Sequence, residues 1–86
     1  MKELELQYKA LANRRRLEIL RLLKRTGRLS VGSVADKIGL SYRSTSKHLG
    51  ILARVNAVAR EQIGLTVYCS LPGKPPLPIK QALERL

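Results

Sequence analysis

The stretch LSYRSTSKHLGIL, from Leu40 to Leu52, decides the fold, because it predicts a turn followed by a helix over about 41–53. Ser41 can cap this helix, since its hydroxyl can accept a hydrogen bond from a free N–H of the first turn. The side chains that would point inward at helical spacing are Thr45, Leu49 and Leu52. The other face carries hydrogen-bond donors and no carboxylate: Tyr42, Arg43, Ser46 and Lys47. This pattern suits the major groove of DNA, and an ordinary surface helix solvated on its charged side has it too.

A second, shorter helix is predicted just before this stretch. Ser30 is a suitable N-cap, and apolar residues then recur at helical spacing: Val31, Val34, Ala35 and Ile38. Gly39 would end this helix in a left-handed conformation, two residues before the next helix begins. Two short helices joined by such a turn form a helix-turn-helix unit, although two-helix corners also occur in proteins that never touch nucleic acid.

Two further helices are expected in the first third of the chain. The first runs from Glu3 to Ala12 and is amphipathic. The second follows Asn13, another N-cap, and is apolar over a wide arc before Gly27 ends it. An arc of that width predicts a central helix that is covered on more than one side.

The last third predicts a hairpin and a short final helix. Asn56 can end the preceding helix in a left-handed conformation. Strands are expected over 58–62 and 65–71, and the second would place its apolar face at Leu65, Val67, Cys69 and Leu71. Pro78 can begin a helix over about 78–86. The predicted fold is mainly α with a β-hairpin wing, a winged helix-turn-helix in one domain of residues 1–86.

Four segments of the chain resemble the ArsR-type winged helix-turn-helix repressors. They are ALANRRRLEILRLL (10–23), LSVGSVADKIGLS (29–41), SKHLGIL (46–52) and VYCSL (67–71), in the family order. The similarity covers about residues 8–71. It implies a dimeric DNA-binding repressor in which residues 30–39 are the positioning helix and 41–53 the recognition helix. The DNA-facing positions that it implies are Tyr42, Arg43, Ser44, Ser46 and Lys47.

Three consecutive arginines open the second helix, where they oppose the helix dipole. Arg16 matches the arginine of the family's usual Asp-Pro-Thr-Arg segment and is assigned to DNA binding. Arg14 and Arg15 depart from that pattern. They fit either extra contacts to phosphate or an acidic partner, or a solvated cluster.

The predicted wing carries a single cation, Arg60, which is also assigned to DNA binding. Glu61 and Ile63 lie at or near its tip, so the wing is less basic than a strong DNA contact requires. Insertion into the minor groove and closure of the core beside the recognition helix are both open roles for it.

Apolar stripes on the first and last helices are candidates for a homodimer interface, which the family commonly builds from these helices. The residues are Leu4, Tyr8, Leu11, Ile79, Leu83 and Leu86. Packing within one protomer is the alternative for each stripe. A domain of 86 residues buries a modest fraction of its surface, so a dimer interface would supplement its core.

The charge of the chain favours a polyanionic partner. Seventeen Lys and Arg against six Asp and Glu give a net charge of +11, which favours nucleic acid first and an anionic membrane second. No apolar run is long enough to span a membrane and no signal peptide is recognised, so a cytoplasmic location is expected. An RNA-binding role is a third, weaker alternative, because the chain has few aromatic residues on which bases could stack.

Catalytic and metal-binding constellations are not found in the sequence. His48, the only histidine, and Cys69, the only cysteine, are expected to be structural. Metal-sensing relatives carry paired cysteines in the positioning helix, where this chain has Val31 and Gly32. We therefore expect no enzyme activity, no cofactor and no metal. The sequence predicts a homodimeric, sequence-specific regulator of transcription that binds double-stranded DNA. The alternatives are a winged-helix module that docks on a protein, or a protein that binds nucleic acid without sequence preference.

Overall fold

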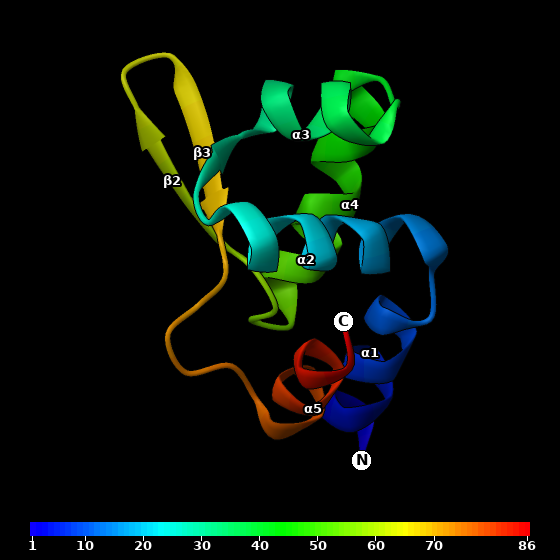
Figure 1. Ribbon diagram of the computed structural model, residues 1–86. Coiled ribbons are helices and arrows are strands. Elements are labelled where there is room, and N and C mark those ends of the chain that lie inside the picture. The colour runs from blue at the N-terminus through cyan, green and yellow to red at the C-terminus, as the bar shows by residue number, and fades with distance from the viewer.

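The computed structural model describes every residue from 1 to 86. Its elements in chain order are α1 (Lys2–Leu11), α2 (Arg14–Thr26), β1 (Leu29–Ser30), α3 (Val31–Ile38), α4 (Tyr42–Arg54), β2 (Ala59–Ile63), β3 (Thr66–Ser70) and α5 (Leu77–Arg85). In Figure 1, α2 crosses the middle of the molecule. The helix α3 and the tip of the hairpin β2–β3 lie on one side of it, α4 passes behind it, and α1 and α5 lie side by side on the other side. No helix combines the length and apolar character needed to cross a membrane.

The predicted helix-turn-helix corner is confirmed, with its caps. The hydroxyl of Ser30 accepts from the backbone N–H of Ser33 at 3.1 Å and begins α3. Gly39 ends α3 at φ 71°, and Leu40 N–H donates to the carbonyl of Ala35 at 3.0 Å. Ser41 then caps α4 by accepting from Ser44 N–H at 3.1 Å. Because few residues other than glycine and asparagine adopt that left-handed conformation without strain, the angle between the two helices depends on Gly39.

The end of α4 is also confirmed. Asn56 is the one residue other than glycine with a positive φ, 58°. The next residue, Ala57, donates its N–H to the carbonyl of Leu52 at 2.9 Å, which closes the last turn of the helix. This stop turns the chain into the hairpin directly after the helix.

The hairpin belongs to a three-stranded antiparallel sheet of order β1-β3-β2. The strand β1 was not predicted; it pairs Leu29 with Cys69 and Ser30 with Tyr68. The prediction that Leu65 lies on the apolar face of its strand is wrong. Leu65 follows Gly64 (φ 61°) in the two-residue turn between Ile63 and Thr66, and its side chain is fully exposed. A turn residue at the tip has no neighbouring strand or helix to cover it.

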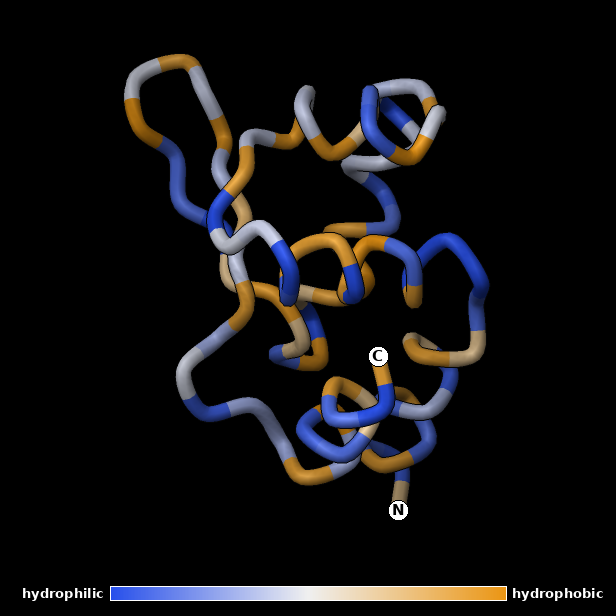
Figure 2. Tube along the Cα trace, in the orientation of Figure 1, coloured by the Kyte–Doolittle hydropathy of each residue, from blue (hydrophilic) through white to orange (hydrophobic).

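The core lies where α2 meets the other helices, and Figure 2 shows apolar residues recurring along α2 at the centre of the molecule. Its largest fully buried apolar residues are Ile19, Leu20, Leu23, Val34, Leu49, Leu52, Cys69 and Ile79. Two residues predicted for a dimer interface belong to this core instead. Leu11 is 9% exposed and Ile79 is 0% exposed, because α1 and α5 turn these side chains inward against the same protomer. Leu83 and Leu86 are half-buried against the core.

Candidate nucleic-acid interface

Helix α4 is divided into a buried and an exposed face, as predicted. Thr45, Leu49 and Leu52 are completely buried beneath it. The predicted DNA-facing residues lie in its first two turns: Tyr42, Arg43, Ser44 and Lys47 are exposed, and Ser46 is half-buried. The structure therefore brings these five residues together on one surface. The buried face of α4 fixes the orientation of this surface, because rotation of the helix would expose its apolar residues.

The surface around α4 is positively charged. Asp36 is the only carboxylate between residues 29 and 60, whereas Lys37, Arg43 and Lys47 contribute cations near the start of α4. The first turn of α4 also contains no acidic residue. Its free N–H groups and the positive end of its dipole favour an anion such as a DNA phosphate.

The wing places its cation beside α4 and its apolar residues at the tip. Arg60 pairs with the buried Cys69 in the sheet, so it faces the helices. Its Nη1 atom lies 3.8 Å from the position that a Cβ on Gly50 would occupy. At the tip, Ile63 and Leu65 are exposed. Arg60 is therefore near the C-terminal half of α4, and no cation reaches out from the tip.

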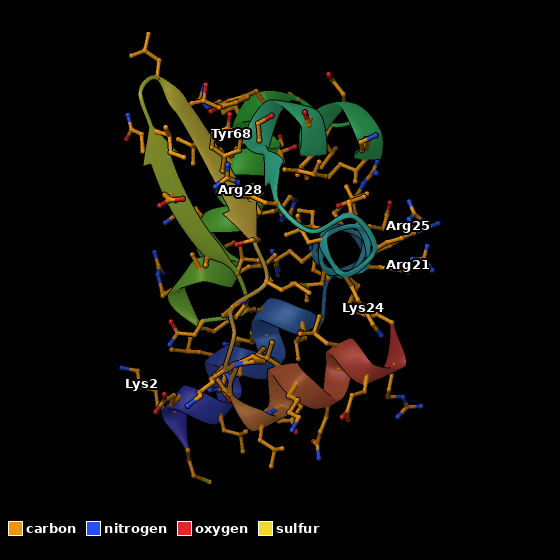
Figure 3. The ribbon with its side chains drawn as sticks, turned by 60° about the vertical axis from the view of Figure 1, so that its left-hand side comes forward. Lys2, Arg21, Lys24, Arg25, Arg28 and Tyr68 are labelled. Carbon is orange, nitrogen blue, oxygen red and sulfur yellow. The ribbon has the colours of Figure 1, made fainter.

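Arg28 fixes the outer face of the hairpin. Its guanidinium lies 4.5 Å from the centre of the Tyr68 ring and 3.4 Å from Oε1 of Glu61 (Figure 3). Arg28 and Glu61 are exposed and Tyr68 is half-buried, so each contact contributes about 1 kcal/mol or less. Glu61 is thereby paired within the protein and its charge opposes DNA less.

Arg16 does not lie on this surface. Its guanidinium donates from Nε to the carbonyl of Ala10 at 2.6 Å, from Nη2 to that of Lys9 at 3.2 Å, and from Nη1 to Nδ1 of His48 at 3.2 Å. The first two acceptors are free carbonyls at the end of α1. Arg16 therefore joins the end of α1 to α4, and the DNA contact expected of it from the sequence stays a prediction.

Neighbouring Arg15 and Arg14 have different environments. Nη1 of Arg15 donates to the carbonyl of Ile38 at 2.8 Å, at the end of α3, and lies 3.7 Å from Glu18. Arg14 is almost fully exposed, and its only ion pair is with Glu18 at 3.9 Å. Arg15 therefore supports the turn of the helix-turn-helix unit, whereas Arg14 fits the solvated alternative.

His48 is held as a neutral imidazole. A guanidinium can only donate, so Nδ1 of His48 accepts from Arg16 and the ring proton is on Nε2. Burial, followed by the charges of Arg16, Lys47 and Arg15, lowers the pKa of His48 below its usual 6.5. Protonation would place a cation against the guanidinium of Arg16.

We expect this environment to make stability depend on pH. Because the pKa is lower in the folded state, the unfolded chain takes up a proton first as the pH falls below about 6.5. Stability should be fully present above that pH and decrease as the pH falls through the folded-state pKa. Urea unfolding between about pH 7.5 and 5.5 measures this, with His48→Gln as the control that flattens the profile. Equal pH dependence in both proteins would contradict the assignment.

Thr45 contains the one buried side-chain polar atom without a hydrogen-bond partner, its Oγ1. An unsatisfied buried hydroxyl costs about 1 to 3 kcal/mol. We expect Thr45→Val, which keeps the shape, to raise the free energy of unfolding by about 1 kcal/mol. Thr45→Ser, which keeps the hydroxyl and removes the methyl group, should lower it. A destabilising Thr45→Val in urea unfolding would show that the hydroxyl has a partner.

Cys69 and the carboxylates form no second site. Burial raises the pKa of the Cys69 thiol to about 11, and its Sγ donates to the carbonyl of Leu29 at 3.3 Å. The thiol is therefore protonated at neutral pH and is a poor nucleophile. No group of three or more His, Cys, Asp and Glu side chains within the chain could hold a metal ion.

A cluster of cations on α2 was missed in the sequence. Arg21, Lys24 and Arg25 are exposed on the polar side of this helix, and Lys37 of α3 is nearby. Their spacing of i, i+3 and i+4 places the three α2 residues on one helical face and is visible in the sequence.

A capped helix-turn-helix corner, a hairpin behind it and a basic exposed helix face define a winged helix-turn-helix protein. Residues 13–54 match the family described as winged helix-turn-helix DNA-binding. The chain is 36% identical over 78 residues to the transcriptional activator HlyU of Vibrio cholerae, covering 91% of this chain and 71% of HlyU. It belongs to the ArsR-type family of winged helix-turn-helix DNA-binding transcriptional regulators.

Further relatives agree with this membership. The nodulation protein NolR of Rhizobium meliloti is 38% identical over 75 residues, which are 87% of this chain and 61% of NolR, so the chain spans less than two thirds of that relative. The structure of reduced HlyU from Vibrio cholerae has a TM-score of 0.81 at 33% identity over 99% of this chain and 85% of that chain. The homodimeric DNA-binding domain of Mb0332 from Mycobacterium bovis has a TM-score of 0.79 at 27% identity, over 98% and 71% of the two chains.

Proposed function

We propose that this protein is a homodimer that regulates transcription by binding a specific DNA sequence with α4 in the major groove. The observation that carries the proposal is the division of α4 into a fully buried apolar face and an exposed, donor-rich first two turns. A rigid helix with donors at its N-terminal end is the usual means of contact with base edges. Retention of one sequence from random DNA by the purified protein would support this function. Equal retention of all sequences would contradict it.

The side chains of α4 have separate roles in the proposal. Arg43, exposed in the first turn, would pair with O6 and N7 of guanine. Lys47 and the side chains of Tyr42, Ser44 and Ser46 would contact the remaining base edges and the nearest phosphates. Arg60, beside the C-terminal half of α4, would contact the backbone at the edge of the same groove. No metal or cofactor is part of this proposal.

The dimer interface would lie on α1 and α5. Leu4 is 45% and Tyr8 is 55% exposed, and together with Met1 they form an apolar stripe on one face of α1. Leu83 and Leu86 are half-buried on the neighbouring helix and would extend the stripe. The homodimeric state of the Mb0332 domain supports this arrangement. A dimer would present two copies of α4 to two half-sites on one side of the DNA.

We expect a dimer at micromolar concentration, and expect Tyr8→Glu to dissociate it, because the new carboxylate would be desolvated in the interface. Tyr8 is more exposed than Leu83, whose substitution would also disturb the core. Sedimentation at about 1 to 100 μM measures the change. Gln62→Glu, which adds the same charge to the hairpin, should leave the dimer intact. A monomeric wild type at about 100 μM would contradict the proposal.

The direction of regulation is a further part of the proposal. The resemblance of the sequence implied a repressor, whereas the relative HlyU is named a transcriptional activator. A dimer bound across a promoter would repress, and one bound upstream of it would permit activation. The proposed function is therefore regulation through a specific site, with repression where that site overlaps a promoter.

A further inference from the structure

Four cations gather on the side of the molecule facing away from the hairpin. Figure 3 shows Arg21, Lys24 and Arg25 projecting from α2 on this side. Lys37, in the last turn of α3, lies across a hollow from Arg21 and Arg25. All four residues are exposed, and none forms an ion pair with a carboxylate. Lys24 donates from Nζ to the carbonyl of Leu83 in α5 at 2.7 Å, and it keeps its positive charge. We call these four residues the α2–α3 basic patch.

The hollow at the centre of the patch has a volume of about 320 Å³ and lies between α2 and α3. The residues that line it are Glu18, Arg21, Leu22, Arg25, Lys37 and Ile38. Glu18 is the one carboxylate there, and it is already paired with Arg14 and Arg15. The hollow therefore presents positive charge that nothing in the protein neutralises.

This arrangement has a cost in the free protein. Arg21 and Arg25 are four residues apart on one helix face, where like charges repel. The molecule as a whole has a net charge of +11, which adds to the repulsion. An anionic partner with charges spaced along a line would relieve it. Guanidinium groups are well suited to phosphate, which they bind with two parallel hydrogen bonds.

We propose that the α2–α3 basic patch binds the backbone phosphates of DNA that flanks the site read by α4. The inference rests on the proposed function and extends it to a second surface. Lys37 makes the two surfaces continuous, because the turn at Gly39 and Leu40 is all that separates α3 from Ser41, the cap of α4. A duplex seated on the N-terminal end of α4 passes close to Lys37, and its flank can reach Arg25 and Arg21 by a modest bend.

The composition of the patch favours DNA over an acidic protein. Protein-docking surfaces are centred on aromatic or aliphatic anchors that are exposed before binding. Here Leu22 is buried at 6% exposure and Ile38 is half-buried, so the hollow offers no such anchor. The one apolar side chain beside Arg21, Lys24 and Arg25 is Leu86, which is half-buried, so the patch is mainly a surface of cations. Such a surface matches a phosphate backbone, which needs charge and little else.

The test compares two duplexes that share one selected operator, a short one and one with about ten extra base pairs on each side, which is roughly one helical turn. The variant is Arg21→Gln/Arg25→Gln. The control is Lys74→Gln/Lys80→Gln, which removes the same charge from exposed positions in the loop before α5 and on α5. Affinity is measured for each protein and duplex over a salt series from about 50 to 200 mM.

We expect wild type and control to bind the long duplex more tightly and with a steeper salt dependence than the short one. The Arg21/Arg25 variant should lose this gain in affinity for the long duplex. Its slope of log affinity against log salt concentration should be smaller by up to about 2 per protomer, which corresponds to about tenfold in affinity across the salt series. It should keep its affinity ranking among operator point changes.

Two results would overturn the inference while leaving the proposed function intact. One is equal affinity of the wild type for both duplexes. The other is an equal loss, in the variant and in the control, of the affinity gained from the flanking DNA. If the variant instead loses binding to polyglutamate while keeping the gain from flanking DNA, the patch is a protein-docking surface and the inference is wrong. A protein that selects no operator contradicts the proposed function itself, and the inference with it.

Discussion

Replacing Arg16 with alanine is expected to lower the free energy of unfolding by about 2 to 4 kcal/mol, because it removes three hydrogen bonds from a charged donor group. Two of these hydrogen bonds go to the carbonyls of Lys9 and Ala10 in the last turn of α1, and the third goes to His48 in α4. A loss of this size is a large part of the stability of a small domain. The contacts tie α1 to α4, so the substitution should loosen both helices together.

Urea unfolding at one fixed protein concentration measures the effect, since a dimer unfolds in a concentration-dependent way. Arg14→Ala is the matched control in the same helix turn. Arg14 forms a single exposed ion pair, with Glu18, so Arg14→Ala should lower the free energy of unfolding by about 0.5 kcal/mol or less. Arg16→Lys keeps the charge but only one donor group, and should recover part of the loss. If Arg16→Ala and Arg14→Ala have equal effects, the structural role assigned to Arg16 is wrong.

Replacing Arg43 with alanine is expected to remove discrimination at one base pair of each half-site. A bidentate contact to guanine contributes about 1 to 3 kcal/mol, so preference at that position should decrease by roughly 5- to 150-fold. The fold should not change, because the Arg43 side chain is exposed and makes no internal contact of the kind that holds Arg16. Affinity for the selected operator and for its point-changed versions measures the preference.

Arg54→Ala is the matched control for this prediction, since Arg54 is exposed on the same helix at its far end. Any loss of affinity that Arg54→Ala causes should be the same for all DNA sequences. A uniform loss for Arg43→Ala, with a change of base preference for Arg54→Ala, would mean that α4 enters the groove by its C-terminal end. That result would reverse the proposed orientation of the protein on DNA.

The helix-turn-helix corner was predictable because its signals are local. Ser30, Gly39, Ser41 and Asn56 each act on the backbone within a few residues, and each is found at the cap where it was expected. Strand β1 was not predictable in the same way. It is two residues long, so it shows no alternation, and it exists only because Leu29 and Ser30 meet β3 about forty residues later.

The apolar stripes illustrate a second limit. Periodicity shows that one face of a helix must be covered, but it does not show by what. Leu11 and Ile79 have the same spacing signals as Leu4 and Tyr8, yet the first pair is buried within the protomer and the second pair is exposed. The difference arises from the way α1 and α5 pack beside α2, which depends on contacts between distant parts of the chain.

Charge patterns are limited for a related reason. A guanidinium can donate to a carbonyl or to a phosphate, so the sequence alone does not say that Arg16 contacts α1 while Arg43 is free. Arg21, Lys24 and Arg25 are the opposite case. Their shared face was visible in the spacing, but their continuity with α4 through Lys37 becomes apparent only when α2 and α3 are side by side.

Selection from random DNA with wild type and Arg43→Ala determines whether α4 reads a DNA sequence through its first turns. We predict that the wild type enriches an inverted repeat whose half-sites are about one helical turn apart. Arg43→Ala should enrich the same repeat with one base pair of each half-site relaxed. If the wild type enriches no sequence, or if Arg43→Ala enriches an unchanged sequence, α4 does not read DNA in this way.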